Sequence, residues 1–329
     1  MNESITYYDS LLNNKLEKDT AFKYGVESSI KKLSVGLRCN PDQLTTHELQ
    51  ILAKKFSRLY FNEVSKFSNS QIRFKYQYVN YLCQIVLGKR KQSTCTRPSQ
   101  IITSNLVKPW DILEYMGNLI AVASLDEVFI NGRLDDRLSK KGFLFTQVEC
   151  VGGMLFFSSV YSNIAISLDK SLNVLNKYEN TGYITYFNDD LYSINIESLT
   201  LNSSLNTILL PALKPWRFRR IDNYLFIADW KEMSTLLKVD LATGIASRVS
   251  FDNVLIPHEI LKVKDKYLVL DKQQGMIFIY NLNFEYLKQI GCFSVQGDGL
   301  CDPISIRMLG EDKVGVLNWL NGDTVVYKL

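Results

Sequence analysis

Residues 291–329 read GCFSVQGDGLCDPISIRMLGEDKVGVLNWLNGDTVVYKL. A glycine-rich approach precedes Pro303, and an apolar run, a polar turn and a second apolar run, VGVLN, follow it. A short turn at Asn321-Gly322 then leads to a closing apolar run, VVY. Short apolar runs separated by tight turns predict β-strands that pair with their neighbours along the chain.

The same unit recurs back to about residue 109. The second apolar run of each unit ends in a small polar residue, at Ser124, Ser159, Asn195, Asp229, Asp271 and Asn318. The turns that precede these runs, at residues 117, 152, 189, 222, 265 and 311, are 35, 37, 33, 43 and 46 residues apart. Such a spacing is typical of a four-stranded propeller blade rather than of a helical pair or a leucine-rich repeat. The six units therefore predict a six-bladed all-β propeller.

The last unit predicts only three strands, near residues 304–308, 314–317 and 324–329. A blade needs four strands, and the strand-like stretch Gln100-Ile101-Ile102-Thr103 can supply the missing outer one. Both ends of the propeller would then lie in one blade, which removes free sheet edges. We therefore expect the propeller to span residues 97–329.

Residues 1–96 predict a basic α-helical bundle, so the whole chain is expected to be an α+β multidomain protein. Thr45-Thr46-His47-Glu48 has the form of a capping box at a helix start. Apolar residues then recur at intervals of three and four from Leu49 to Tyr60, which predicts one apolar helix face.

Charge is distributed unevenly between these two parts. Residues 1–100 hold 16 Lys and Arg against 8 Asp and Glu, a balance of +8, whereas residues 101–329 hold 22 against 26, a balance of −4. In residues 51–100, ten basic residues face a single acid, Glu63. The excess predicts a surface for nucleic acid or for an acidic protein, although a merely solvated helical surface remains the alternative. The candidate nucleic-acid contacts are Lys54, Lys55, Arg58, Arg73, Lys75, Lys89, Arg90 and Lys91.

Two resemblances follow from these segments. The segment around Pro303 resembles an NHL-type repeat, and related proline anchors precede Trp110, Trp216 and His258, while two blades lack the anchor. The resemblance implies a ligand-binding propeller, because most NHL-like propellers bind protein or RNA and a minority are lactonases, lyases or cyclases. Residues 40–92 weakly resemble the SAM-like core-binding domain of tyrosine recombinases. The His-x-x-Arg pair of the recombinase catalytic domain is absent from this sequence.

The sequence also bears on catalysis. Inner-strand positions Ile112, Val148, Phe218, Ile260 and Ile306 are apolar, which predicts a channel poor in metal ligands. The small polar residues at the ends of the second runs are expected to cap turns. The alternative is a calcium site of the kind found in propeller lactonases, which needs several carboxylates or amides converging on the central channel. The propeller holds a single histidine, His258, which we expect in a turn beside Pro257. We expect no cofactor and no metal.

Two functions remain. The first is a non-catalytic adaptor, in which the basic domain binds nucleic acid or an acidic partner and the propeller binds another protein. The candidate protein-binding residues form a Trp and Arg cluster, comprising Trp110, Trp216, Arg217, Arg219 and Arg220. Trp216 packing between blades, and a solvated edge at Arg219-Arg220, are the alternatives. The second function is a lactonase-like hydrolase or lyase with a metal site in the central channel.

The start of the chain lacks the apolar core of a signal peptide, which favours a cytoplasmic location without a membrane partner.

Overall fold

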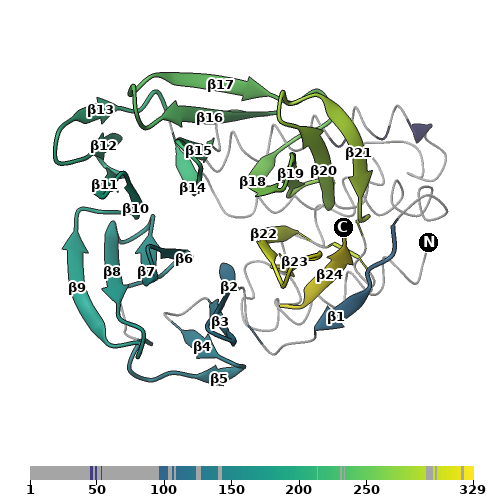
Figure 1. Cartoon of the computed structure of the whole chain (residues 1–329). Coiled ribbons are helices and arrows are strands. Elements are labelled where there is room, and N and C mark those ends of the chain that lie inside the picture. The colour runs from purple at the N-terminus through teal and green to yellow at the C-terminus, as the bar shows by residue number, and fades with distance from the viewer. Residues whose placement is uncertain are drawn as a thin grey trace, which may run out of the picture.

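The protein forms a six-bladed propeller in the part of the chain that the computed structural model describes (Figure 1). The described residues are 45, 46, 49, 53, 96–102, 106, 109–123, 127–139, 143–212, 214–229, 232, 234–293, 299, 300, 302–319 and 322–329. Within them, six four-stranded antiparallel sheets surround a central axis. The propeller predicted from the repeat spacing is thus confirmed.

Each sheet is one blade, and its strands run outward from the axis in sequence order, apart from the last blade. The innermost strands are β2 (Asp111–Tyr115), β6 (Gln147–Val151), β10 (Tyr183–Phe187), β14 (Pro215–Ile221), β18 (Pro257–Val263) and β22 (Pro303–Met308). The second strands are β3 (Asn118–Val122), β7 (Met154–Ser159), β11 (Asp190–Asn195), β15 (Tyr224–Asp229), β19 (Lys266–Asp271) and β23 (Lys313–Asn318). The third strands are β4 (Val128–Ile130), β8 (Ile164–Leu168), β12 (Thr200–Asn202), β16 (Thr235–Asp240), β20 (Met276–Asn281) and β24 (Thr324–Lys328). The outer strands are β5 (Arg133–Leu134), β9 (Val174–Glu179), β13 (Thr207–Leu209), β17 (Ala246–Ser250), β21 (Tyr286–Ile290) and β1 (Gln100–Ile102). We number the blades 1 to 6 from β2 to β22.

Blade 6 closes the ring. Its order is β1-β24-β23-β22, so a strand from the start of the propeller completes a sheet made from its end. Gln100 pairs with Val326, Ile101 with Val325, and Ile102 with Thr324. The predicted closure by residues 100–103 is confirmed for residues 100–102, and residue 103 lies outside the described residues.

The hydrophobic core of the propeller lies between its blades. Apolar side chains from the facing surfaces of two neighbouring blades form each of six buried clusters among the described residues. Between blades 1 and 6, for example, Ile112 and Ala121 pack against Ile304 and Leu317. Because both faces of every sheet are covered in this way, the strands carry near-continuous apolar runs.

Little of the N-terminal part belongs to the described residues. Thr46, Leu49 and Ala53 are helical, and the backbone N–H of Leu49 donates to the carbonyl oxygen of Thr45 at 3.0 Å. A helix therefore starts at the predicted position. The rest of the predicted bundle, and all eight candidate nucleic-acid contacts from Lys54 to Lys91, lie outside the described residues. Among the residues described, no helix has the length and apolar character needed to cross a membrane.

Removing β1 should destabilise the propeller, because β24 would lose its outer partner. We expect a variant lacking residues 1–106 to melt several degrees below one lacking residues 1–95, which keeps β1. In a domain of this size, a loss of about 1 kcal/mol lowers Tm by about 2–4 °C. Differential scanning calorimetry of the two truncated proteins provides the measurement, and equal melting temperatures would contradict closure through β1.

Candidate functional site: the central channel and its mouth

A kink at the start of the inner strands decides which side chains face the axis. In β14, β18 and β22 the pairing register shifts after the first residue, a proline, and leaves Trp216, His258 and Ile304 as the extra residues of β-bulges. A bulge redirects the side chains that follow it. Beyond each bulge the strand alternates regularly, with one residue toward the channel and the next toward a neighbouring blade.

The channel-facing positions are polar and buried. The first ring around the axis is formed by Asp111, Gln147, Tyr183, Arg217, Glu259 and Ser305, and further along are Glu149, Thr185, Arg219 and Arg307. The apolar residues between them, such as Ile112 and Ile260, belong to the clusters between blades. The prediction of a channel lined by these apolar residues is therefore wrong by one position, which in a β-strand exchanges the two faces.

Three carboxylates and three guanidinium groups neutralise one another in the channel. Arg217 lies 2.8 Å from Asp111 and 3.3 Å from Glu259, measured between Nη2 and the carboxylate oxygens. Arg307 pairs with the same two acids. Arg219 pairs with Glu259 and approaches Glu149 at 3.5 Å. We call these six side chains the axial network.

Neutral side chains and backbone N–H groups donate hydrogen bonds to the carboxylates of the axial network. The Tyr183 hydroxyl donates to Glu149 at 2.5 Å, and the Ser305 hydroxyl donates to Asp111 at 2.6 Å. The backbone N–H of Ile306 donates to Glu259 at 3.0 Å, and that of Val148 donates to Asp111 at 3.0 Å. Every blade thus contributes at least one group to the network or to its hydrogen bonds.

The pKa values of the two glutamates shift in opposite directions. Burial raises the pKa of Glu149, against the opposing effect of Arg219 and of the Tyr183 hydroxyl. Burial acts in the same direction on Glu259, but Arg217, Arg307 and Arg219 outweigh it and hold its pKa well below the usual range. Glu259 therefore carries a firmly held negative charge among three arginines.

Aromatic side chains gather at the channel mouth where the inner strands begin. Trp110 contacts Tyr161, Trp216 and Trp319, with ring centroids 5.8, 5.3 and 6.3 Å apart, and Tyr161 lies 5.3 Å from Trp216. Trp110, Trp216 and Trp319 are half-buried, whereas Tyr161 is 54% exposed. We call these four residues the aromatic mouth.

His258 fixes one side of the aromatic mouth. It lies at the bulge of β18 rather than in the expected turn, is buried, and accepts a hydrogen bond at Nε2 from Trp216 Nε1 at 2.8 Å. Burial, together with nearby Lys272 and Arg217, holds the pKa of His258 well below its usual value. A neutral imidazole in this position supports the indole of Trp216.

The predicted Trp and Arg cluster is divided by the structure. Trp110 and Trp216 lie in the aromatic mouth, and Trp216 makes the ring contacts given above. Arg217 and Arg219 are only 3% and 9% exposed, so the expectation of one exposed cluster is wrong. Their side chains turn inward because they follow the bulge. Arg220 is half-buried and donates to the backbone oxygen of Asp222 at 3.0 Å, near the opposite face.

The expected turn-capping role is confirmed at three second-strand ends. The side-chain oxygens of Ser159, Asn195 and Asp271 accept backbone N–H groups from the turns that follow, at 2.8–3.1 Å. Asp229 accepts from the backbone of Lys214 at 3.0 Å, and Ser124 lies outside the described residues.

Across the described ranges, no three His, Cys, Asp or Glu side chains lie where they could hold a metal ion.

Sequence reasoning missed the axial network, yet a signal for it was present. At four inner strands a proline is followed by one further residue and then by a polar residue, and these polar residues are Asp111, Arg217, Glu259 and Ser305. The proline begins the strand in β14, β18 and β22 and precedes it in β2. The four polar residues form one column of the repeat, and acidic and basic residues both occur in it, which is visible only when the blades are compared. Tyr161 and Trp319 carried no comparable signal, because each follows a second strand as a single aromatic residue.

Comparisons with known proteins show the fold alone. No protein-family model matches the chain, and no curated protein sequence does. A streptogramin B lyase structure is similar with a TM-score of 0.50 at 11% identity, and the match covers 68% of this chain and 80% of that chain. A chain from a mitotic checkpoint complex is similar with a TM-score of 0.51 at 9% identity, over 71% of this chain and 92% of that chain.

Replacing Glu259 with Gln should be strongly destabilising, because it leaves three buried guanidinium groups with only two carboxylates. We expect a loss of about 3–5 kcal/mol in the free energy of unfolding. Glu197→Gln is the matched control, since Glu197 is exposed in a turn, and we expect it to change stability by less than about 0.5 kcal/mol. Urea denaturation of both variants gives the comparison, and similar stability of the two would show that the network is energetically unimportant.

Proposed function

We propose that this chain is a non-catalytic interaction protein whose propeller binds a protein partner at the aromatic mouth. The observation that carries the proposal is the half-exposed group of three Trp and one Tyr at the centre of one face. Trp and Tyr supply large, rigid contact areas and are enriched among the residues that dominate binding energy at protein interfaces. Tyr161 offers the most accessible ring of the four.

The arrangement of the channel supports binding rather than turnover. Its carboxylates are engaged by arginines, and the one histidine of the propeller already accepts a hydrogen bond from Trp216. A hydrolase or lyase would need an acid, a base or a metal ion that is free to reach substrate. Similar folds occur in a lyase and in a protein assembly, so the fold itself does not choose between these functions.

The Tyr161→Ala variant tests this proposal. We expect it to lose the captured partner when full-length tagged protein is purified from its native cells after mild crosslinking. Tyr286→Ala is the matched control, because Tyr286 is 45% exposed on the outer strand β21, and it should retain the partner. A loss of about 2 kcal/mol, typical of an interface hot spot, corresponds to an affinity about 30-fold lower. Equal capture by the two variants would contradict the assignment to the aromatic mouth.

We further propose that the basic part of the chain binds nucleic acid, with an acidic protein as the other possible partner. The ten basic residues against one acid in residues 51–100 support this second interaction. Each phosphate that a protein neutralises releases a counterion, so binding by such a surface weakens steeply with salt.

For this second interaction we expect Lys54→Glu with Lys55→Glu to weaken binding of labelled DNA or RNA by the full chain. Lys170→Glu with Lys313→Glu makes the same charge change on exposed propeller positions and should have little effect. The assay is a titration with duplex and single-stranded DNA and RNA at several salt concentrations. If no nucleic acid binds even at about 50 mM salt, the charge serves a protein interface instead.

A further inference from the structure

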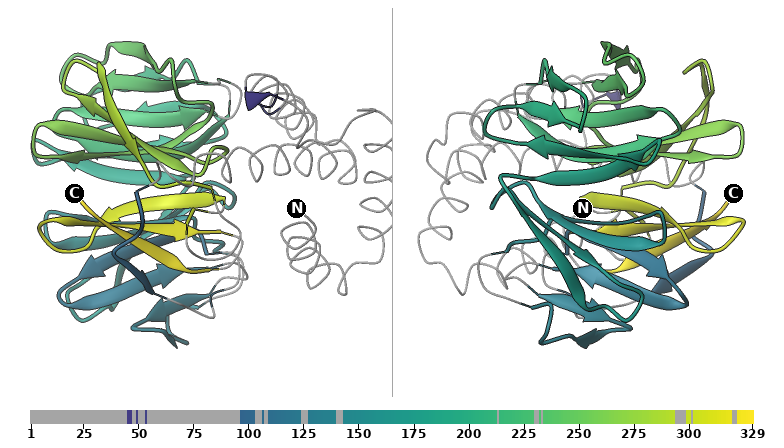
Figure 2. Two further views of the ribbon diagram at one scale, coloured as in Figure 1. Left: turned by 90° about the vertical axis from the view of Figure 1, so that its right-hand side faces the viewer. Right: turned by 60° about the vertical axis from the view of Figure 1, so that its left-hand side comes forward.

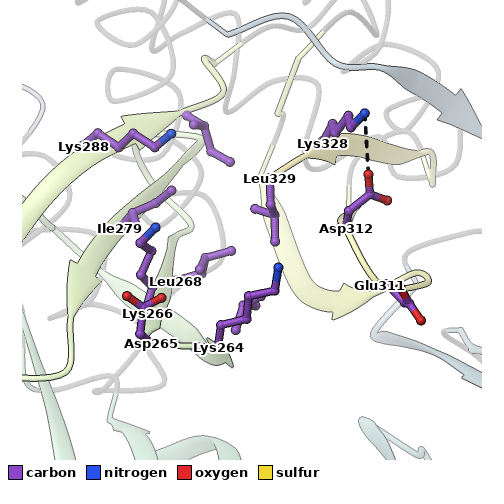
Figure 3. Close-up of a pocket in the computed structure, with 12 residues that line it drawn as sticks. Lys264, Asp265, Lys266, Leu268, Ile279, Lys288, Glu311, Asp312, Lys328 and Leu329 are labelled. Atoms are coloured by element: carbon purple, nitrogen blue, oxygen red, sulfur yellow. Dashed lines mark ion pairs between the residues drawn. The ribbon is translucent and has the colours of Figure 1, made fainter.

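A second concave site lies on the face opposite the aromatic mouth. A pocket of about 200 Å³ is formed between blades 5 and 6 by the end of β18, its turn to β19, and strands of both blades (Figure 3). Strand β18 has His258, its second residue, beside the aromatic mouth and ends at the pocket with Val263. The two sites therefore lie on opposite faces of the disc, since they are at opposite ends of the same inner strand. The left view of Figure 2 shows the ribbon of the disc from the side.

The pocket combines an apolar floor with a lysine rim. Leu268, Ile279 and Ile290 in the floor are each no more than 5% exposed. Three exposed lysines, Lys264, Lys266 and Lys288, stand along the side formed by blade 5, as Figure 3 shows. The floor can therefore take up an apolar group while the rim attracts negative charge.

The three rim lysines are available to a ligand. Lys328, on the other side of the pocket, pairs with Asp312 at 3.7 Å. No ion pair joins Lys264, Lys266 or Lys288 to an acid among the described residues. Asp265 lies in the same turn, and Glu311 points away from the pocket in Figure 3. An anion on the blade 5 side would thus meet positive charge that is not paired with any acid in the described part of the chain.

The size of the pocket indicates the class of ligand. Sites for cofactors and drug-sized molecules usually measure about 300–1,000 Å³. A pocket of about 200 Å³ falls below that range and is suited to one large side chain. A protein segment can fill such a pocket with a single residue and place its neighbouring residues on the rim.

We propose that this pocket binds an acidic segment of a partner protein, which inserts one bulky apolar side chain and places its carboxylates on Lys264, Lys266 and Lys288. The apolar side chain packs on Leu268, Ile279 and Ile290 and gains most of its binding energy from burial. The lysines select acidic flanks and accelerate association. This site is independent of the aromatic mouth, so the two assignments can fail separately.

Fluorescence anisotropy with synthetic peptides tests the proposal on the full chain. The probe is a labelled Glu-Glu-Leu-Glu-Glu peptide, and the comparison peptide carries Ala at its centre. Because the basic residues before the propeller also attract acidic peptides, the differences between variants decide the result. We expect Lys264→Glu with Lys288→Glu to weaken binding of the Leu peptide at least fivefold at about 50 mM salt, and the difference to shrink at about 500 mM salt.

Two further variants make the outcome decisive. Val263→Trp fills the pocket without changing charge, and we expect it to abolish the preference for Leu over Ala at the centre of the peptide. Lys170→Glu with Lys177→Glu changes charge on blade 2, and its affinity should stay within twofold of the native protein. The proposal is overturned if the pocket variants bind the Leu peptide like the native protein, if Leu and Ala peptides bind equally, or if octanoate occupies the pocket and the peptide does not.

Discussion

The propeller depends on charge balance at its axis. Three carboxylates and three guanidinium groups are buried there, and removing one partner of such a group leaves a buried charge without compensation. The six groups come from blades 1, 2, 4, 5 and 6, and Tyr183 joins blade 3 through Glu149. A blade shifted along the axis would separate at least one of these pairs. The axial network therefore favours one relative position of the blades, which the non-directional packing between them cannot specify alone.

Closure through β1 and the axial network act on different parts of the disc. The network holds the inner strands together, whereas pairing of β1 with β24 ties the two ends of the propeller at the rim of blade 6. Apolar clusters between neighbouring blades fill the space from axis to rim. Each blade is therefore constrained at its inner edge, on both faces and, for blade 6, at its outer edge as well.

The architecture was predictable because it depends on features that each repeat shows separately. Apolar runs and turns identified the blades, and the shortage of one strand after Pro303 identified β1 as the closing strand. The channel was not predicted, because its content depends on the bulge at Trp216, His258 and Ile304, which sets the alternation of the inner strands. A shift of one residue exchanges Phe218 for Arg217 or Arg219 at the axis. The aromatic mouth was predicted in part, since Trp110 and Trp216 were recognised, whereas Tyr161 and Trp319 meet them only through the closed ring.

The aromatic mouth and the lysine-rimmed pocket lie at opposite ends of β18. The axial network lies at the channel, whereas the lysine-rimmed pocket is formed between blades 5 and 6 by other residues, so the two share no side chain. The one inner strand that contributes to both sites is β18, with His258 at one end and Val263 at the other. Between them, Glu259 is held by three arginines, and Ile260 is buried between blades 4 and 5. Energetic coupling between sites requires an element with two alternative arrangements, and β18 is fixed in one by these contacts. These contacts of β18 support our two proposals as assignments of separate binding surfaces on one scaffold, each with its own partner.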